Sequence, residues 1–121
     1  MDLLGADFPF HAEALAGKRA LICGASGGIG AATARMMAKA GASVVVAARS
    51  VDKLDALVEE LACLGPGPHM AMALDLEDLS AVEAAVKTLL SDGPVHVLVN
   101  NAGGPPGGAL IDAEVDEFIA P

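Results

Sequence analysis

A chain of 121 residues, 54% of them hydrophobic, is long enough for one domain with a buried core. Its net charge of −9 argues against a nucleic-acid partner, because such binding depends on cationic contacts with phosphates. No apolar run reaches the roughly 18 residues of a membrane-spanning helix, and no basic segment opens the chain, so we expect a cytoplasmic protein without a membrane partner. Cysteines and histidines lack metal-ligand spacing, so no metal site is expected and Cys23 and Cys63 are predicted to be buried thiols.

The chain opens on a segment without clear pattern, followed by a strand, a glycine-rich turn and a helix. Residues 1–16 are interpreted as a leader ahead of one domain over residues 17–121. The apolar run 19–23 predicts a buried strand, and helical spacing resumes near Ile29 and stops at Gly41. The side of this helix that we expect to face the core carries Ile29, Thr33, Met36, Met37 and Ala40.

Glycines at positions 24, 27, 28 and 30 separate that strand from its helix. Without Cβ atoms the backbone can turn sharply and a diphosphate can approach closely, while N–H groups of the first helical turn point at the anion. The same glycines are also consistent with a tight turn that binds no ligand. Both interpretations stay open on the loop alone.

The rest of the chain alternates strands and helices. The run 43–48 predicts a second strand, and residues 51–61 predict a helix with an apolar face. The alternating Gly and Pro of residues 65–68 end that helix, and a third strand is predicted at 69–74. A capping-box pattern from Ser80 to Glu83 predicts the start of the next helix. A fourth strand at 95–99 precedes a Gly- and Pro-rich loop over 100–108.

This alternation predicts a parallel sheet joined by right-handed crossovers. Ligands of such sheets bind at the carboxyl ends of the strands, where Gly24, Arg49, Asp75 and Asn100 are expected to converge. An arginine about twenty residues beyond a glycine loop accommodates the 2′-phosphate of NADP, whereas an acidic residue there binds the ribose of NAD. Arg49 therefore favours NADP, with an ordinary surface arginine as the alternative. Asp75 could equally be a turn or helix-capping carboxylate.

Two motifs in order carry a resemblance to a known family. The spacing G-x-x-x-G-x-G, set by Gly24, Gly28 and Gly30, precedes the run from Asn100 to Gly103, which directly follows an apolar strand. Together they resemble the short-chain dehydrogenase/reductase family over residues 17–120, which correspond to the N-terminal half of such an enzyme. The resemblance implies a three-layer, Rossmann-like half fold of class α/β, with a parallel sheet of four to five strands in the order 3-2-1-4 and helices on both faces.

The resemblance also implies a cofactor site. In the family, the acidic residue that ends the third strand meets the adenine, and its match here is Asp75, followed by Leu76. The motif from Asn100 to Gly103 matches one that stabilises the central sheet and lines the adenosine side of the cofactor. One departure is Cys23, which stands where the family usually has threonine. The implied cofactor-binding residues are Gly24, Ser26, Gly28, Ile29, Gly30, Arg49, Ser50, Asp75, Leu76, Asn101, Ala102 and Gly103.

The catalytic residues of the family have no match in this chain. The family uses a tyrosine as general acid/base, with a lysine four residues later and a serine upstream, and this sequence contains no tyrosine. We therefore expect no catalytic residue here. The chain is interpreted as the cofactor-binding half of an NADP-dependent oxidoreductase of carbonyl or alcohol substrates, which binds NADP weakly and is inactive alone. The alternative is a non-catalytic, self-associating half-fold that binds no nucleotide.

The predicted fourth strand, 95–99, would leave one sheet edge open. We therefore expect a homodimer, formed by pairing this strand with its copy or by exchange of the C-terminal segment between chains. The alternative is that residues 104–121 fold back over the edge, or that a fifth strand forms over 109–115.

Overall fold

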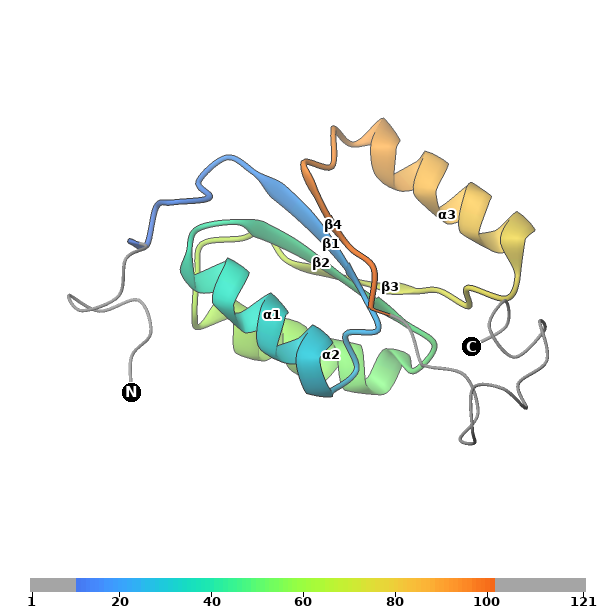
Figure 1. Ribbon diagram of the computed structural model, residues 1–121, viewed down its shortest axis with the longest axis horizontal. Helices are drawn as coiled ribbons and strands as arrows, with labels where there is room; N and C mark the ends of the chain where they lie inside the picture. Colours follow the sequence, from blue (N-terminus) through green and yellow to red (C-terminus); the bar gives the residue numbers. More distant parts are fainter. Residues whose placement is uncertain (1–10, 102–121) are drawn as a thin grey trace, which may run out of the picture.

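The computed structural model describes residues 11–101, and residues 1–10 and 102–121 are not described. Strands and helices alternate along this part of the chain, as predicted (Figure 1). The third and fourth strands are shorter than expected, because only residues 70–73 of the predicted 69–74 and residues 97–99 of the predicted 95–99 pair with a neighbouring strand. The elements are β1 (Arg19–Cys23), α1 (Gly28–Lys39), β2 (Ser43–Ala48), α2 (Val51–Ala62), β3 (Met70–Ala73), α3 (Leu79–Ser91) and β4 (Val97–Val99).

The four strands form one parallel sheet in the order β3-β2-β1-β4, which the family resemblance implied. In the centre, Ile22 of β1 pairs with Val46 of β2 on one side and with Val99 of β4 on the other. Figure 1 shows α1 and α2 on one face of the sheet and α3 on the other. The three-layer α/β architecture is therefore confirmed, and all four strands end at the same edge of the sheet.

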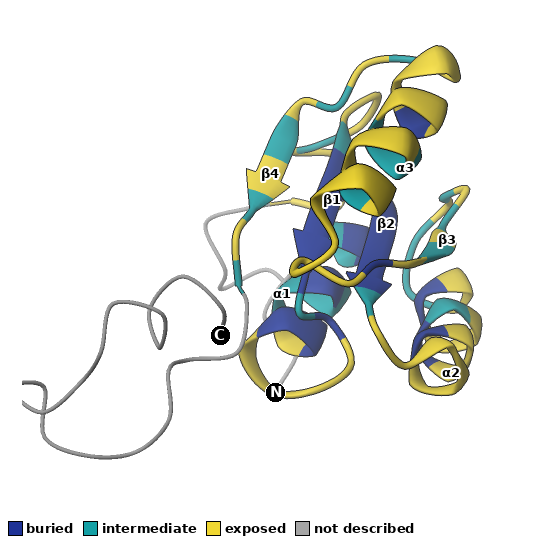
Figure 2. Ribbon diagram, turned by 90° about the vertical axis from the view of Figure 1, so that its right-hand side faces the viewer, coloured by how far each residue is buried: buried dark blue, intermediate teal, exposed yellow. Residues whose placement is uncertain are grey.

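Side chains along β1 and β2 alternate between the two faces of the sheet, so each strand contributes to two cores. Figure 2 shows that β1 and β2 are buried almost throughout, whereas β4 and the outer side of α3 are not. The core with α1 and α2 includes Ile22, Val44, Val46, Leu54, Leu57 and Leu61. The smaller core with α3 contains Leu21, Cys23, Val45, Ala47, Leu74 and Leu89.

The inward side of α1 differs from the prediction. Its buried residues are Gly30, Ala31, Ala34 and Ala38, whereas Ile29 is 75% exposed. Thr33, Met36 and Met37 are only half-buried, and Ala40, just beyond the helix, is buried as expected. The small side chains allow close packing of α1 on the strands. A prediction from hydrophobicity alone places the larger apolar residues on the inward side, and in a helix this rich in alanine it does not identify the face that packs on the sheet.

The start of α3 also differs from the capping-box prediction. The N-cap is Asp78, whose Oδ1 accepts a hydrogen bond from the backbone N–H of Ala81 at 3.1 Å. Ser80 lies inside the first turn of the helix. Asp78 takes this place because its carboxylate accepts a hydrogen bond from the first turn, where N–H groups have no partner within the helix.

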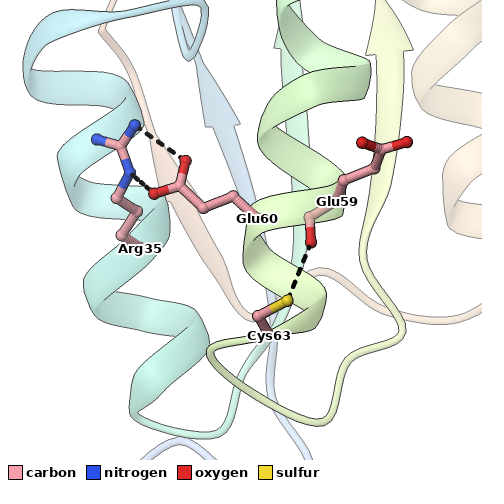
Figure 3. Close-up of polar contacts among 4 residues, drawn as sticks. All are labelled: Arg35, Glu59, Glu60 and Cys63. Carbon is pink, nitrogen blue, oxygen red and sulfur yellow. Dashed lines mark hydrogen bonds and ion pairs between the residues drawn. The ribbon is translucent and has the colours of Figure 1, made fainter.

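Two contacts at α2 are drawn in Figure 3. Arg35 of α1 forms an ion pair with Glu60 of α2, with Nε 2.8 Å from Oε1, and this pair joins the two helices of one layer. Cys63 follows α2, and its Sγ donates to the carbonyl of Glu59 at 3.8 Å. Cys63 is exposed, so the prediction of two buried thiols is correct for Cys23 and wrong for Cys63. Its position just beyond the last helical turn leaves it outside the packed face.

Candidate functional site

A cavity of about 500 Å³ opens at the carboxyl edge of the sheet, between the glycine loop and the ends of β2 and β3. Of the twelve residues predicted to bind a cofactor, nine line it: Gly24, Ser26, Gly28, Ile29, Arg49, Ser50, Asp75, Leu76 and Asn101. Gly30 is buried and does not line the cavity. Ala102 and Gly103 lie outside the described residues.

The glycine loop has the backbone conformation that glycine favours at two positions. Gly24 has φ +66° and Gly28 has φ +57°, a region that other residues rarely adopt. The helix α1 begins at Gly28, and its N-cap Gly27 has no side chain to accept a hydrogen bond. The N–H groups of the first turn are therefore left for water or for a ligand in the cavity.

The end of β4 meets this loop. Asn101 Nδ2 donates a hydrogen bond to the carbonyl of Gly24 at 3.4 Å, although the two residues are 77 positions apart. A Cβ on Gly24 would overlap the backbone carbonyl of Asn101, so this position has room only for glycine. The loop is therefore packed against the chain that leaves β4.

Charges of both signs line the cavity. Arg49, at the end of β2, is exposed and has no hydrogen-bond or ion-pair partner among the described residues. Asp75 and Glu77 follow β3, and Asp75 Oδ1 accepts a hydrogen bond from the backbone N–H of Glu77 at 3.0 Å. Asp75 therefore has the turn role that was its alternative interpretation, and it also lines the cavity. The basic group lies at one strand end and the acidic groups at another.

Cys23, at the end of β1, is one of the residues that line the cavity. Desolvation by burial raises the pKa of its thiol, so the thiol is neutral at pH 7. A neutral thiol adds no negative charge beside the glycine loop. Cys23 therefore acts as a small apolar group in the lining of the cavity and as part of the core beneath α3.

Some lining residues were missed by sequence reasoning. Gly27 belongs to the same loop and could have been named from it. Ala47, Ala48 and Leu74 lie within the predicted strands, at or next to their last residues, and they are apolar residues without a binding signal. Glu77 had no signal in the sequence, because only the turn at Asp75 brings it to the cavity. Within residues 11–101 no group of three or more His, Cys, Asp or Glu could hold a metal ion, and no helix is long and apolar enough to cross a membrane.

A second hollow, of about 350 Å³, lies between α3 and β4. Its lining is almost wholly apolar and includes Leu90, which is 50% exposed, and Leu98, which is 56% exposed. Asn100 lies in this second hollow and not in the cavity beside the glycine loop. The two asparagines that end the described chain thus lie on different sides of β4.

Fold and site together define a class: an open α/β protein with a parallel sheet and a glycine loop that begins a helix at a strand's carboxyl end. The chain matches the model of the short chain dehydrogenase family over residues 18–120, and it belongs to that family. It is 42% identical over 89 residues to a probable oxidoreductase of Streptomyces lividans, which covers 74% of this chain and 29% of that protein. It is 46% identical over 88 residues to L-xylulose reductase of Mus musculus, covering 73% of this chain and 33% of the enzyme.

Solved structures agree with this assignment. L-sorbose reductase from Gluconobacter frateurii, complexed with NADPH and L-sorbose, matches with a TM-score of 0.75 and 34% identity over 88% of this chain and 41% of that one. A metagenomic short-chain oxidoreductase in complex with NADP matches with a TM-score of 0.75 and 40% identity, over 86% of this chain and 47% of that one. The 121 residues span less than half the length of these proteins, and 29% to 39% of several curated relatives.

Proposed function

We propose that this chain is the nucleotide-binding part of an NADP-dependent short-chain oxidoreductase whose substrates are carbonyl compounds or alcohols. The observation that carries the proposal is that Arg49 and the glycine loop line the same cavity. The loop offers N–H groups and close backbone approach to a diphosphate, and the unpartnered guanidinium offers paired hydrogen bonds to a 2′-phosphate. The NADP and NADPH in the related solved structures support the same cofactor.

The proposed contacts all concern the adenosine half of the cofactor. Asp75 and Leu76 would face the adenine, Arg49 and Ser50 the 2′-phosphate, and Gly24 to Gly30 the diphosphate. The sequence contains no tyrosine to act as the family's general acid/base. The 121-residue chain is therefore expected to bind the cofactor weakly and not to transfer hydride.

The proposal is tested by calorimetric titration of the 121-residue protein with NADPH and, in the same buffer, with NADH. Saturable binding that favours NADPH is expected. Arg49→Ala should weaken NADPH binding roughly tenfold to a hundredfold and leave NADH binding unchanged, because charge-assisted hydrogen bonds to the 2′-phosphate are lost. Lys53→Ala is the matched control, since Lys53 is an exposed cation on α2 that does not line the cavity.

Absence of heat with either nucleotide in wild type contradicts this function and favours the non-catalytic half-fold. Binding with equal affinity for NADPH and NADH would remove the role proposed for Arg49 while keeping the loop as a dinucleotide site. A cytoplasmic location stays a prediction from the sequence, which cell fractionation would test.

We further propose that two copies of the 121-residue chain associate through β4. Among the described residues β4 pairs only with β1, and Leu98 on it is 56% exposed. An unpaired strand edge with an exposed leucine beside an apolar hollow is a site for pairing with a second copy. Sedimentation equilibrium should give a dimer, and Leu98→Lys should shift it toward monomer. A wild-type monomer at high concentration contradicts the proposal.

A further inference from the structure

All three histidines of the chain use Nδ1 as the acceptor for a backbone N–H. His11 Nδ1 accepts from the residue two positions along the chain, at 3.3 Å and in an exposed position. His96 Nδ1 accepts from Arg19 at 2.9 Å, also in an exposed position. His69 differs from both, because its bond is partly buried and joins the residue before β3 to β2. Its Nδ1 accepts from the N–H of Val44 at 3.1 Å.

The two hydrogen bonds of the His69 ring define its protonation state. The N–H of Val44 can only donate, so Nδ1 carries no proton and accepts. Nε2 lies 3.3 Å from the carbonyl oxygen of Gly65, which can only accept, so Nε2 carries the proton and donates. Only the neutral imidazole satisfies both partners, because a protonated ring would present Nδ1–H to the N–H of Val44. We call this ring with its two backbone partners the His69 clamp.

The surroundings of the ring leave its bond to Val44 without a ready substitute. Val44 is 0% exposed, so water does not reach its N–H in the folded sheet. The ladder between β2 and β3 starts at Val45 and Met70, so the imidazole takes the place of a backbone carbonyl at its amino end. The preceding turn packs on the ring, since an added Cβ on Gly67 would lie 3.1 Å from Cδ2 and 3.2 Å from Nε2. Loss of the bond would leave a buried donor unpaired, which is costly.

The clamp consists of one side chain and two uncharged backbone groups. The sequences of β2 and β3 contain no charged residue. On the helices of the same layer, the last turn of α1 carries Lys39, and α2 carries Glu59 and Glu60 near its end. Glu60 is paired with Arg35, and the Cys63 thiol donates to the carbonyl of Glu59. The two hydrogen bonds, rather than a charged partner, therefore determine which form of the imidazole the fold favours.

We propose that the His69 clamp is a proton-sensitive device that fastens the start of β3 to β2 only while the imidazole is neutral. Uptake of a proton by His69 removes the acceptor for the N–H of Val44 and releases this end of β3. The unfolded chain has no such bond and takes up the proton at the ordinary pKa of histidine, about 6.5. The stability supplied by the clamp is therefore complete well above that pH and decreases as the pH falls below it. The same strand continues into Leu74 and Asp75, which line the cavity.

The test compares the pH dependence of stability in wild type and His69→Gln, because glutamine keeps an acceptor oxygen and does not titrate. Urea denaturation is measured at about pH 7.5 and about pH 5.5, on either side of the ordinary pKa of histidine. The equilibrium constant for folding of wild type should fall roughly threefold to tenfold through this one histidine. His69→Gln should lose that part of the decrease.

The other two histidines supply the matched controls. His11→Gln should keep the whole wild-type decrease, because the His11 bond is local and exposed. His96→Gln should keep most of it, because water can replace the exposed bond between His96 and Arg19.

A second measurement needs no variant and decides the proposal if His69→Gln does not fold. NMR of isotope-labelled wild type follows the ring nitrogens of the three histidines and the amide of Val44 over the same pH range. At the higher pH the proton of His69 should lie on Nε2. As Nδ1 takes up a proton, the Val44 amide resonance should shift with the titration of His69 and not with those of His11 and His96.

An equal decrease in stability in wild type and His69→Gln would overturn the proposal. So would a His69 ring that takes up its proton without a change at the Val44 amide. Loss of the decrease in His96→Gln, with His69→Gln behaving like wild type, would place the proton-sensitive bond at Arg19 and would also overturn it.

Discussion

Arg19 Nη2 donates a hydrogen bond to the carbonyl oxygen of Leu89 at 2.8 Å, which ties the first residue of β1 to the last turn of α3. Nε of the same guanidinium donates to the carbonyl of Pro94 at 3.1 Å, and Nη2 also donates to that of Gly93. The last carbonyls of a helix have no partners within it, and a cation near that end is favourable. Arg19 therefore attaches α3 to the sheet at the edge opposite the cavity.

Arg19→Met should lower the free energy of unfolding by about 1.5–3 kcal/mol, because it keeps the apolar stem and removes charged donors from partly buried carbonyls. Urea denaturation followed by circular dichroism measures the change. Lys18→Met is the control on an exposed neighbour, with an expected change within about 0.5 kcal/mol. Equal losses in the two variants would contradict this role.

Leu54 of α2 is fully buried in the core beneath α1 and α2. Leu54→Ala should lower the free energy of unfolding by about 2–5 kcal/mol, because apolar contacts are lost and a cavity remains. Leu79→Ala at the start of α3 should change it by less than about 0.5 kcal/mol, since Leu79 is 76% exposed. Thermal or urea unfolding tests both. A loss below about 1 kcal/mol for Leu54→Ala would contradict the full burial of Leu54 in this core.

Gly30→Ala adds a methyl group where Gly24 and Asn101 leave no room. We expect a loss of about 1–3 kcal/mol in the free energy of unfolding of the ligand-free protein, as for other overpacked sites. Gly27→Ala is the matched control for stability, because an added Cβ there meets nothing within 4 Å. Its φ of −179° is extended backbone open to alanine. Similar thermal stability of the two variants would refute the close packing at Gly30.

Alanine substitutions at Asp78 and at Ser80 are expected to have different effects on stability, because only Asp78 caps α3. Asp78→Ala should lower the free energy of unfolding by about 0.5–2 kcal/mol, the usual cost of losing an N-cap. Ser80→Ala should be neutral or slightly stabilising, because alanine is favoured inside a helix. Thermal unfolding distinguishes the two. A larger loss at Ser80 than at Asp78 would restore the capping-box interpretation.

The ion pair between Arg35 and Glu60 is about half-exposed, with side-chain exposures of 43% and 47%. Its coupling free energy, from a double-mutant cycle with Arg35→Ala and Glu60→Ala, should be about 0.2–1 kcal/mol and should fall as salt is added. Urea denaturation at low and high ionic strength measures it. A coupling that is unchanged by salt would contradict the half-exposed position of the two side chains.

The strands and helices were predictable because their signals are local. The β-branched run of β2 and the glycines and prolines at 65–68 mark element ends directly in the chain. The inward face of α1 was not predictable in this way. Its buried residues are glycine and alanines, which allow the helix to lie close to the strands but give a weaker hydrophobic signal than the larger apolar residues of the same helix. The N-cap of α3 is Asp78, two residues before the predicted Ser80. The sequence could not distinguish them, because aspartate and serine are both favoured at the N-cap position.

For the candidate site, the sequence by itself determined which residue types stand at each strand end: glycines after β1, Arg49 after β2, Asp75 after β3 and Asn101 after β4. Only the tertiary structure decided which of them share a cavity, that Gly30 is buried beneath it, and that Asn101 supports Gly24. The reason is physical. A local signal depends on the conformational preference of a few neighbouring residues, whereas a contact between residues 77 positions apart depends on the order and register of the strands that bring them together.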